Sequence, residues 1–209
     1  METLTEVKKL KIPLFDSKTE RIFCELEKTQ KEFWNLDREC ASFLYTLIQI
    51  HNSKNVLEIG TSNGYSSIWI AKALENTKGK LTTIEFWEKR QRIARNNIKI
   101  CCPNTEFNPK IGSAVVVLED LSDDIKKSKT EKFDFVFIDA NKREYVKYFH
   151  LISKMTTDNA VILADNILSH YEKVNDYVQN LFNDKNWYSQ ILDMGAGMML
   201  SVKQRKNIK

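Results

Sequence analysis

Glycine and proline are scarce in this chain, with 6 and 3 among 209 residues. Because average proteins contain about 7% glycine, a collagen-like or linker-rich chain is excluded. The four cysteines form no Cys-x-x-Cys pair, and Cys101 and Cys102 are adjacent, a poor layout for a disulfide framework or a zinc site. No apolar run approaches the roughly 18 residues of a membrane span, and the amino terminus has charges where a signal peptide needs apolar residues. We therefore expect a cytoplasmic protein with no membrane partner.

Charge and length are those of a globular domain. The chain is 42% hydrophobic and 29% charged, and its net charge of +4 is too small to imply nucleic-acid binding. Part of that charge lies in Lys203–Lys206, which we expect to be a solvated tail. The sequence predicts one domain over residues 1–209, with a helical cap (1–51), an α/β core (52–202) and a basic tail (203–209).

Helical and strand patterns alternate after residue 51. Residues 20–51 carry two amphipathic helical patterns, and then short apolar runs alternate with helices. The runs are NVLEI, KLTTIE, a strand ending near Ile111, FDFVFID and AVILAD, with helical segments between them, including 88–100 and 115–128. Continuous apolar strands are typical of a parallel sheet covered on both faces, so we expect a doubly wound α/β domain. The segments NWYSQILD and MMLSVK are too close for a helix between them and predict a C-terminal antiparallel hairpin.

Polar residues follow the first strand in VLEIGTSNGYSS. Ligands bind at the carboxyl ends of parallel strands, and glycine is needed where backbone approaches a ligand closely. Gly60 and Gly64 bracket a strand-to-helix turn, and the helix start offers free N–H groups to a carboxylate. The G-x-x-x-G spacing argues against a dinucleotide pyrophosphate site. On the turn alone, an ordinary tight turn explains the glycines equally well.

Glu85 ends the second strand, where an acidic residue commonly accepts hydrogen bonds from both ribose hydroxyls of an adenosine group. The alternative is an acid that stabilises the start of a helix. Taken with the glycine turn, Glu85 indicates a nucleoside ligand.

Two further strands each end in an aspartate, in FDFVFIDANK and AVILADN. These strands should be neighbours about 4.8 Å apart, which places Asp139 and Asp165 together at one edge of the sheet. Two such carboxylates repel unless a cation or proton lies between them. With the Asn166 carbonyl they offer three hard oxygen ligands for Mg²⁺ or Ca²⁺, and Lys142 could reach the same site. The alternative is a pair of helix-capping aspartates.

Together these segments resemble the metal-dependent class I O-methyltransferases of the catechol and caffeoyl-CoA type, from about Asp37 to Val202. The resemblance implies a Rossmann-like methyltransferase sheet, S-adenosylmethionine as methyl donor, and Mg²⁺ (or Ca²⁺ or Mn²⁺) as cofactor. The residues that would bind the donor are Glu58, Gly60, Thr61, Gly64, Ser66, Glu85, Phe86, Ser113, Ala114 and Asp139. The metal ligands would be Asp139, Asp165 and Asn166, and the catalytic residues Lys142, as general base, and Asp139.

The chain departs from this family in several places. Residues 155–160 lack the Pro-Gly-Gly turn usual before the second metal strand, and Gly112-Ser113-Ala114 replaces a common Gly-Asp-Ala sequence at the adenine wall. The amino-terminal helices and the Gly195-Ala196-Gly197 turn match least, so we expect them to select the acceptor.

The resemblance leaves the acceptor open. A small catechol-like or phenolic hydroxyl is expected, because vicinal hydroxyls can bind a metal through two oxygens. One alternative is a tRNA methyltransferase acting on a hydroxylated wobble uridine, and another is a non-catalytic protein that binds S-adenosylmethionine. A homodimer is expected by analogy with similar proteins.

Overall fold

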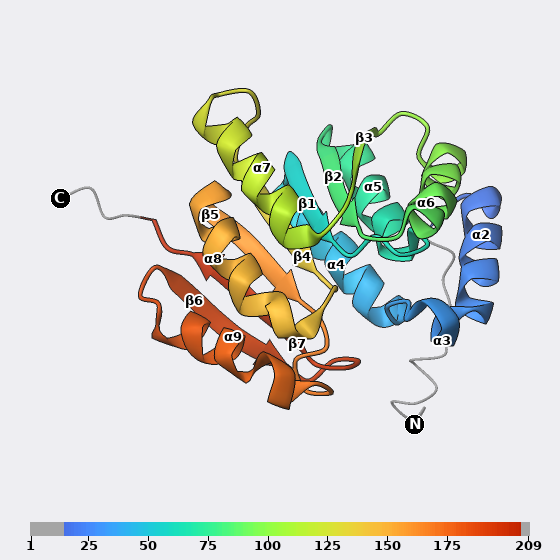
Figure 1. Ribbon diagram of the computed structural model, residues 1–209. Coiled ribbons are helices and arrows are strands. Elements are labelled where there is room, and N and C mark those ends of the chain that lie inside the picture. The colour runs from blue at the N-terminus through green and yellow to red at the C-terminus, as the bar shows by residue number, and fades with distance from the viewer. Residues whose placement is uncertain (1–14, 206–209) are drawn as a thin grey trace.

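A computed structural model describes residues 15–205, which fold around one central sheet (Figure 1). Expectations for residues 1–14 of the cap and 206–209 of the tail lie outside the described part. None of the helices within residues 15–205 has the length and apolar character needed to cross a bilayer.

The sheet has seven strands in the order β3-β2-β1-β4-β5-β7-β6. The strands are β1 (Asn55–Ile59), β2 (Lys80–Glu85), β3 (Glu106–Ile111), β4 (Phe133–Ile138), β5 (Thr156–Ala164), β6 (Trp187–Leu192) and β7 (Met198–Lys203). All pairings from β3 to β5 are parallel, whereas β7 is antiparallel to both β5 and β6. The predicted doubly wound, mostly parallel sheet with an antiparallel C-terminal hairpin is therefore confirmed.

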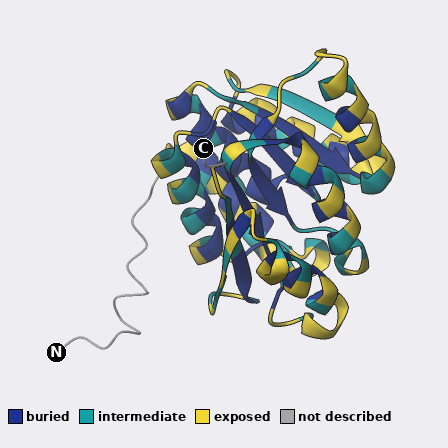
Figure 2. Cartoon of the chain, turned by 90° about the vertical axis from the view of Figure 1, so that its left-hand side faces the viewer, coloured by how far each residue is buried: buried dark blue, intermediate teal, exposed yellow. Residues whose placement is uncertain are grey.

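Helices cover both faces of this sheet (Figures 1 and 2). The helices are α2 (Ser17–Lys28), α3 (Gln30–Phe33), α4 (Arg38–His51), α5 (Tyr65–Thr77), α6 (Glu88–Cys101), α7 (Ala114–Lys126), the 3-10 turn η1 (Lys142–Glu144), α8 (Tyr145–Met155) and α9 (Tyr171–Asn183). Helices α2, α4, α5 and α6 share one core with Phe135 and Phe137 of β4, while α7, α8 and α9 share another with Val136 and Ile138. Because alternate residues of β4 face different cores, the strand needs a continuous apolar run.

The described part of the amino-terminal cap, residues 15–51, contains three helices where the sequence predicts two patterns. The additional helix, α3, has four residues and ends at Trp34, whose φ of 54° lies in the left-handed region. Arg38 joins α4 to α2 through ion pairs with Glu20 (2.9 Å) and Glu27 (2.7 Å). These ion pairs hold α2 and α4 of the cap together.

Strand β5 begins at Thr156, earlier than the run that starts at Ala160. Thr156 pairs with Phe133 and Val161 with Phe135, so the register shifts between these pairs. Asn159, at φ 62°, lies within the shifted segment. Asparagine tolerates this conformation, which explains how the strand starts here without the Pro-Gly-Gly turn.

Candidate active site

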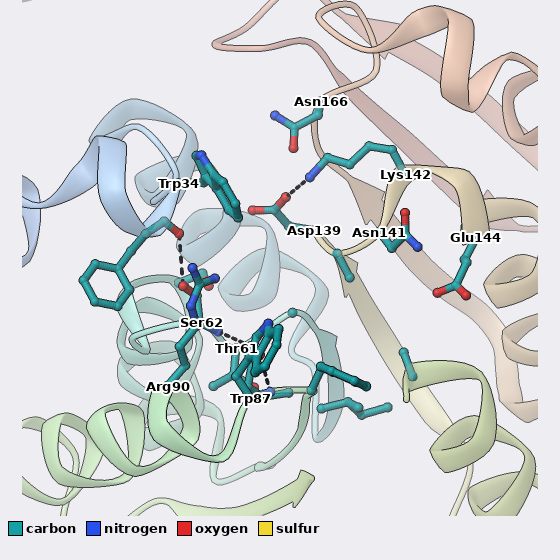
Figure 3. A pocket seen from close by; sticks show the side chains of 18 of the residues that line it. Trp34, Thr61, Ser62, Trp87, Arg90, Asp139, Asn141, Lys142, Glu144 and Asn166 are labelled. Carbon is teal, nitrogen blue, oxygen red and sulfur yellow. Dashed lines mark hydrogen bonds and ion pairs between the residues drawn. The ribbon is translucent and has the colours of Figure 1, made fainter. Parts of the chain in front are cut away.

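A cavity of about 740 Å³ opens at the carboxyl ends of β1, β2, β4 and β5. Its wall includes the turn after β1, the end of β2, α3 and the start of α7, and on the other side residues 139–144, Asn166, His170 and Lys173. Figure 3 shows Asp139 and Lys142 in its centre, with Ser62 and Trp87 toward one end and Glu144 toward the other. The predicted donor residues in the wall are Gly60, Thr61, Ser66, Glu85, Phe86, Ser113, Ala114 and Asp139.

The two glycines of the first turn have different roles. Gly60 has a φ of 106°, and a Cβ there would overlap the carbonyl oxygen of Asp139. Gly64 has a φ of 88°, and its Cβ would lie 3.0 Å from Ala94 of α6, so this glycine permits close packing of α5 and α6. Only Gly60 belongs to the cavity wall; Gly64, predicted to bind the donor, does not.

Glu58 lies behind the wall. Its side chain is fully buried and accepts hydrogen bonds from the hydroxyls of Ser66 (2.6 Å), Thr83 (2.7 Å) and Ser67. Burial raises the pKa of Glu58 to about 7, although these hydroxyls oppose the shift. Glu58 therefore orients Ser66, which does line the cavity, and the structure does not bring the Glu58 carboxylate to the predicted donor itself.

Glu85 is fixed by the backbone around it. Its two carboxylate oxygens accept hydrogen bonds from the N–H groups of Ser62 (2.8 Å) and Trp87 (2.9 Å). Phe86 and Trp87 are 61% and 60% exposed beside it. A carboxylate oxygen can accept more than one hydrogen bond, so Glu85 keeps the capacity to bind a ribose. The rings beside it offer flat apolar surface to a base.

Asp139 and Asp165 occupy equivalent positions, because the strand residues that precede them, Ile138 and Ala164, are paired. The Asp165 N–H donates to the carbonyl of Ile138 at 2.9 Å. Burial, and then the negative charge of Asp139, raises the pKa of Asp165. The register of β4 with β5 therefore places the two strand ends side by side, as the sequence predicts.

The Asp165 carboxylate has an unsatisfied oxygen. Asp165 is 4% exposed, and its Oδ1 has no hydrogen-bond partner among residues 15–205. Asp165 lines not the main cavity but a side cavity of about 160 Å³, which shares Trp34, Asn35, Leu36 and Asn166 with the main one. Asn166, the residue after Asp165, has a φ of 64°. Figure 3 shows it on the same side of the cavity as Asp139 and Lys142.

A divalent cation fits this donor set. A buried carboxylate oxygen without a donor is costly, and a cation would satisfy it while removing the repulsion between the two aspartates. Within residues 15–205 no cluster of three His, Cys, Asp or Glu side chains could hold a metal. A metal here would therefore depend on two carboxylates and the Asn166 amide oxygen, which is a hard oxygen set.

Lys142 forms an ion pair with Asp139, with 2.9 Å between Nζ and Oδ1 (Figure 3). The pair is about four-fifths buried, since the side chains are 20% and 17% exposed. Lys142, the predicted base, thus lies beside Asp139, a predicted metal ligand, in the middle of the cavity.

Several wall residues have no signal in the sequence. Trp34 is 75% exposed. The Cζ atom of Arg90 lies 5.2 Å from the centroid of the Trp34 ring and 5.5 Å from that of the Phe33 ring. Arg143 and Lys173 line the opposite end. None of these residues ends a predicted strand. The rule that ligands bind at the carboxyl ends of parallel strands, which identifies Glu85 and Asp139, therefore does not identify them.

The Gly195-Ala196-Gly197 turn contributes Ala196 to the side cavity. A Cβ on Gly195 would lie 2.6 Å from the sulfur of Cys40 in α4, and one on Gly197 would overlap Leu168. The N–H groups of Leu168 and Ser169 donate to the Ala196 carbonyl. The turn is therefore held between α4 and the segment that follows Asp165.

Known proteins are similar to this chain in sequence and fold. The family model described as O-methyltransferase matches residues 17–203. A catechol O-methyltransferase of Niastella koreensis is 35% identical over 126 residues, 60% of this chain and 55% of that protein. A caffeoyl-CoA O-methyltransferase of Petroselinum crispum is 32% identical over 145 residues, 68% of this chain and 59% of that protein.

The matched segments thus span little more than half the length of these relatives. A solved structure of an O-methyltransferase from Bacillus cereus, in complex with SAH, superposes with a TM-score of 0.82 at 28% identity and covers 96% of each chain. On the family match and this fold, the chain belongs to the O-methyltransferase family.

Proposed function

We propose that this protein transfers a methyl group from S-adenosylmethionine to a hydroxyl of a small catechol-like or phenolic acceptor, with a divalent cation at Asp139, Asp165 and Asn166. The observation that carries the proposal is the single cavity that joins Glu85 at one end to the Asp139–Lys142 pair in its centre. Its volume of about 740 Å³ falls within the range of small-molecule sites.

The donor would lie over the ends of β1 and β2. Glu85 would accept hydrogen bonds from the ribose, and Phe86, Ser113 and Ala114 would contact the adenine. Ser66, held from behind by Glu58, would meet the methionine part. The complex of the Bacillus cereus protein with SAH supports a donor of this kind.

The acceptor would lie over the ends of β4 and β5. A bound divalent cation would polarise the acceptor oxygen and favour its deprotonation. Asp139, Asp165 and Asn166 would hold that cation, and Lys142 would accept the hydroxyl proton at Nζ, which requires the amine to be neutral. Holding acceptor and donor in one cavity, the wall residues would align the oxygen with the methyl group.

Removal of the metal tests this mechanism. Methyl transfer to catechol should stop in excess EDTA and return with Mg²⁺, and Asp165→Ala should lower turnover by at least about 100-fold. Asp123→Ala is the matched control, because Asp123 lies on α7 in an exposed pair with Lys126. SAH binding measured by calorimetry should persist in Asp165→Ala if it folds. Full turnover of wild type in EDTA, or of Asp165→Ala, would reject the mechanism.

RNA as acceptor is the second candidate. The exposed Trp34, Phe86 and Trp87 at the cavity favour it, since aromatic rings stack on unpaired bases. The first residue of the basic tail does not, because Lys203 donates to the carbonyls of Ser153 in α8 and of Thr156, where β5 begins, at the opposite end of β5 from the cavity. Methylation of tRNA that weakens steeply with salt would favour this candidate.

A non-catalytic protein and a homodimer stay predictions with simple tests. SAH binding without product across a broad panel of hydroxyl acceptors would favour a binding protein. Light scattering of the full chain tests the homodimer.

A further inference from the structure

The charged residues of the cavity wall differ in how fully they are paired. Its three carboxylates all have partners within the protein. Glu85 accepts from two backbone N–H groups, Asp139 pairs with Lys142, and Glu144 accepts a 2.7 Å hydrogen bond from the Tyr148 hydroxyl. Each carboxylate of the wall therefore already has a hydrogen-bond or ion-pair partner.

Two cations of the same wall are unpaired. Arg143 in η1 and Lys173 in α9 line the cavity, and neither side chain has a hydrogen bond or ion pair with any residue of the described range 15–205. The other cations are engaged, Lys142 by Asp139 and Arg90 by the rings of Phe33 and Trp34.

Arg143 and Lys173 belong to the acceptor end. The element η1 packs against α9, and both follow the strands that end at Asp139 and Asp165. His170, at the start of α9, also lines this end of the cavity. The wall at this end has three cations, Lys142, Arg143 and Lys173, and two carboxylates, Asp139 and Glu144, so its side chains carry a net positive charge.

We propose that the acceptor carries, in addition to its hydroxyl, an anionic group that Arg143 and Lys173 bind. This inference rests on the proposed methyl transfer and narrows its substrate to a small hydroxylated acid. Arginine matches a carboxylate or phosphate with two parallel hydrogen bonds, and lysine adds a point charge. A small acid is favoured over an RNA phosphate, because the cavity volume of about 740 Å³ is that of a small-molecule site and Lys203, the first residue of the basic tail, is bonded to Ser153 of α8.

A matched pair of acceptors tests the inference. Protocatechuate and its methyl ester have the same two hydroxyls and differ in one charge. In the wild-type enzyme with Mg²⁺, kcat/KM should be about tenfold higher for the acid, which corresponds to about 1.4 kcal/mol. In the double variant Arg143→Gln with Lys173→Gln, the ratio of acid to ester should fall to about one. Arg92→Gln, an exposed residue of α6 paired with Glu88 outside the cavity, should keep the ratio.

The outcomes separate this inference from the proposed function. Equal kcat/KM for acid and ester in wild type, or an unchanged preference in the double variant, would overturn the anionic acceptor while methyl transfer stands. If neither compound is methylated although SAH binds, the proposed function fails and this inference fails with it. Competitive inhibition by a short single-stranded RNA, without inhibition by benzoate, would assign the two cations to nucleic-acid phosphate and overturn the small acid.

Discussion

Two buried tyrosines next to the site allow a sharp stability experiment. The rings of Tyr145 and Tyr177 pack edge to face with their centroids 5.5 Å apart, and both side chains are fully buried. The Tyr145 hydroxyl lies 3.2 Å from the carbonyl of Asp165 and 3.3 Å from that of Ile138, where it can donate to either. The Tyr177 hydroxyl is buried with no partner among residues 15–205.

The same chemical change should therefore have different consequences at the two positions. Tyr145→Phe removes a donor from two strand-end carbonyls and should lower the free energy of unfolding by about 1–3 kcal/mol. Tyr177→Phe removes a hydroxyl that is already unsatisfied, so it should be neutral or stabilise the protein by up to about 1 kcal/mol. The two variants should differ by roughly 2 kcal/mol.

Urea unfolding of both variants and wild type, followed by circular dichroism, measures this difference. The denaturant slope should stay the same, so that the midpoints alone report stability. Equal destabilisation by the two substitutions would refute the reasoning, because both keep the ring and it would mean that the unpaired Tyr177 hydroxyl stabilises the fold as much as the bonded Tyr145 hydroxyl.

Three further changes have expected outcomes. Gly60→Ala should lower stability by about 3 kcal/mol, because φ is 106° and the new Cβ overlaps the Asp139 carbonyl; thermal unfolding measures it. Arg38→Gln should cost about 2 kcal/mol in urea unfolding by breaking two part-buried ion pairs, whereas the exposed Arg92→Gln should cost less than about 0.5 kcal/mol. The pKa of Glu58 is raised from 4.5 to about 7, so the folded state binds the extra proton and stability falls as pH rises across that window. Glu58→Gln should remove this pH-dependent part of the unfolding free energy, which is about 3 kcal/mol. Urea unfolding of the variant at several pH values measures it, and a pH dependence identical to that of wild type would contradict the prediction.

The strand ends could be predicted from sequence because parallel strands place their carboxyl ends at one edge. This rule alone locates Glu85, Asp139 and Asp165, and the register of β4 with β5 brings the aspartates to equivalent positions. The continuous apolar runs likewise predict a sheet covered on both faces.

Other parts of the site depend on tertiary placement that periodicity does not encode. Helix α3 has four residues, too few for a helical pattern, so the position of Trp34 has no local signal. Glu58 lies in β1, which is buried on both faces, so no alternation of polar and apolar residues shows that its side chain lies behind the cavity wall. Arg143 and Lys173 are ordinary surface cations in sequence, and they line one cavity only because α9 packs against η1.

The turn held between Cys40 and Leu168 has a consequence for biosynthesis. The donor side of the cavity comes from residues 33–36, 60–66, 84–90 and 112–114, so a growing polypeptide contains these parts early. The compartment beside Asp165 is enclosed only when residues 195–197 reach α4. Until residues 195–197 have been synthesised, the chain therefore contains the residues of the β1 and β2 side of the cavity but lacks Ala196, which completes the wall of the side cavity.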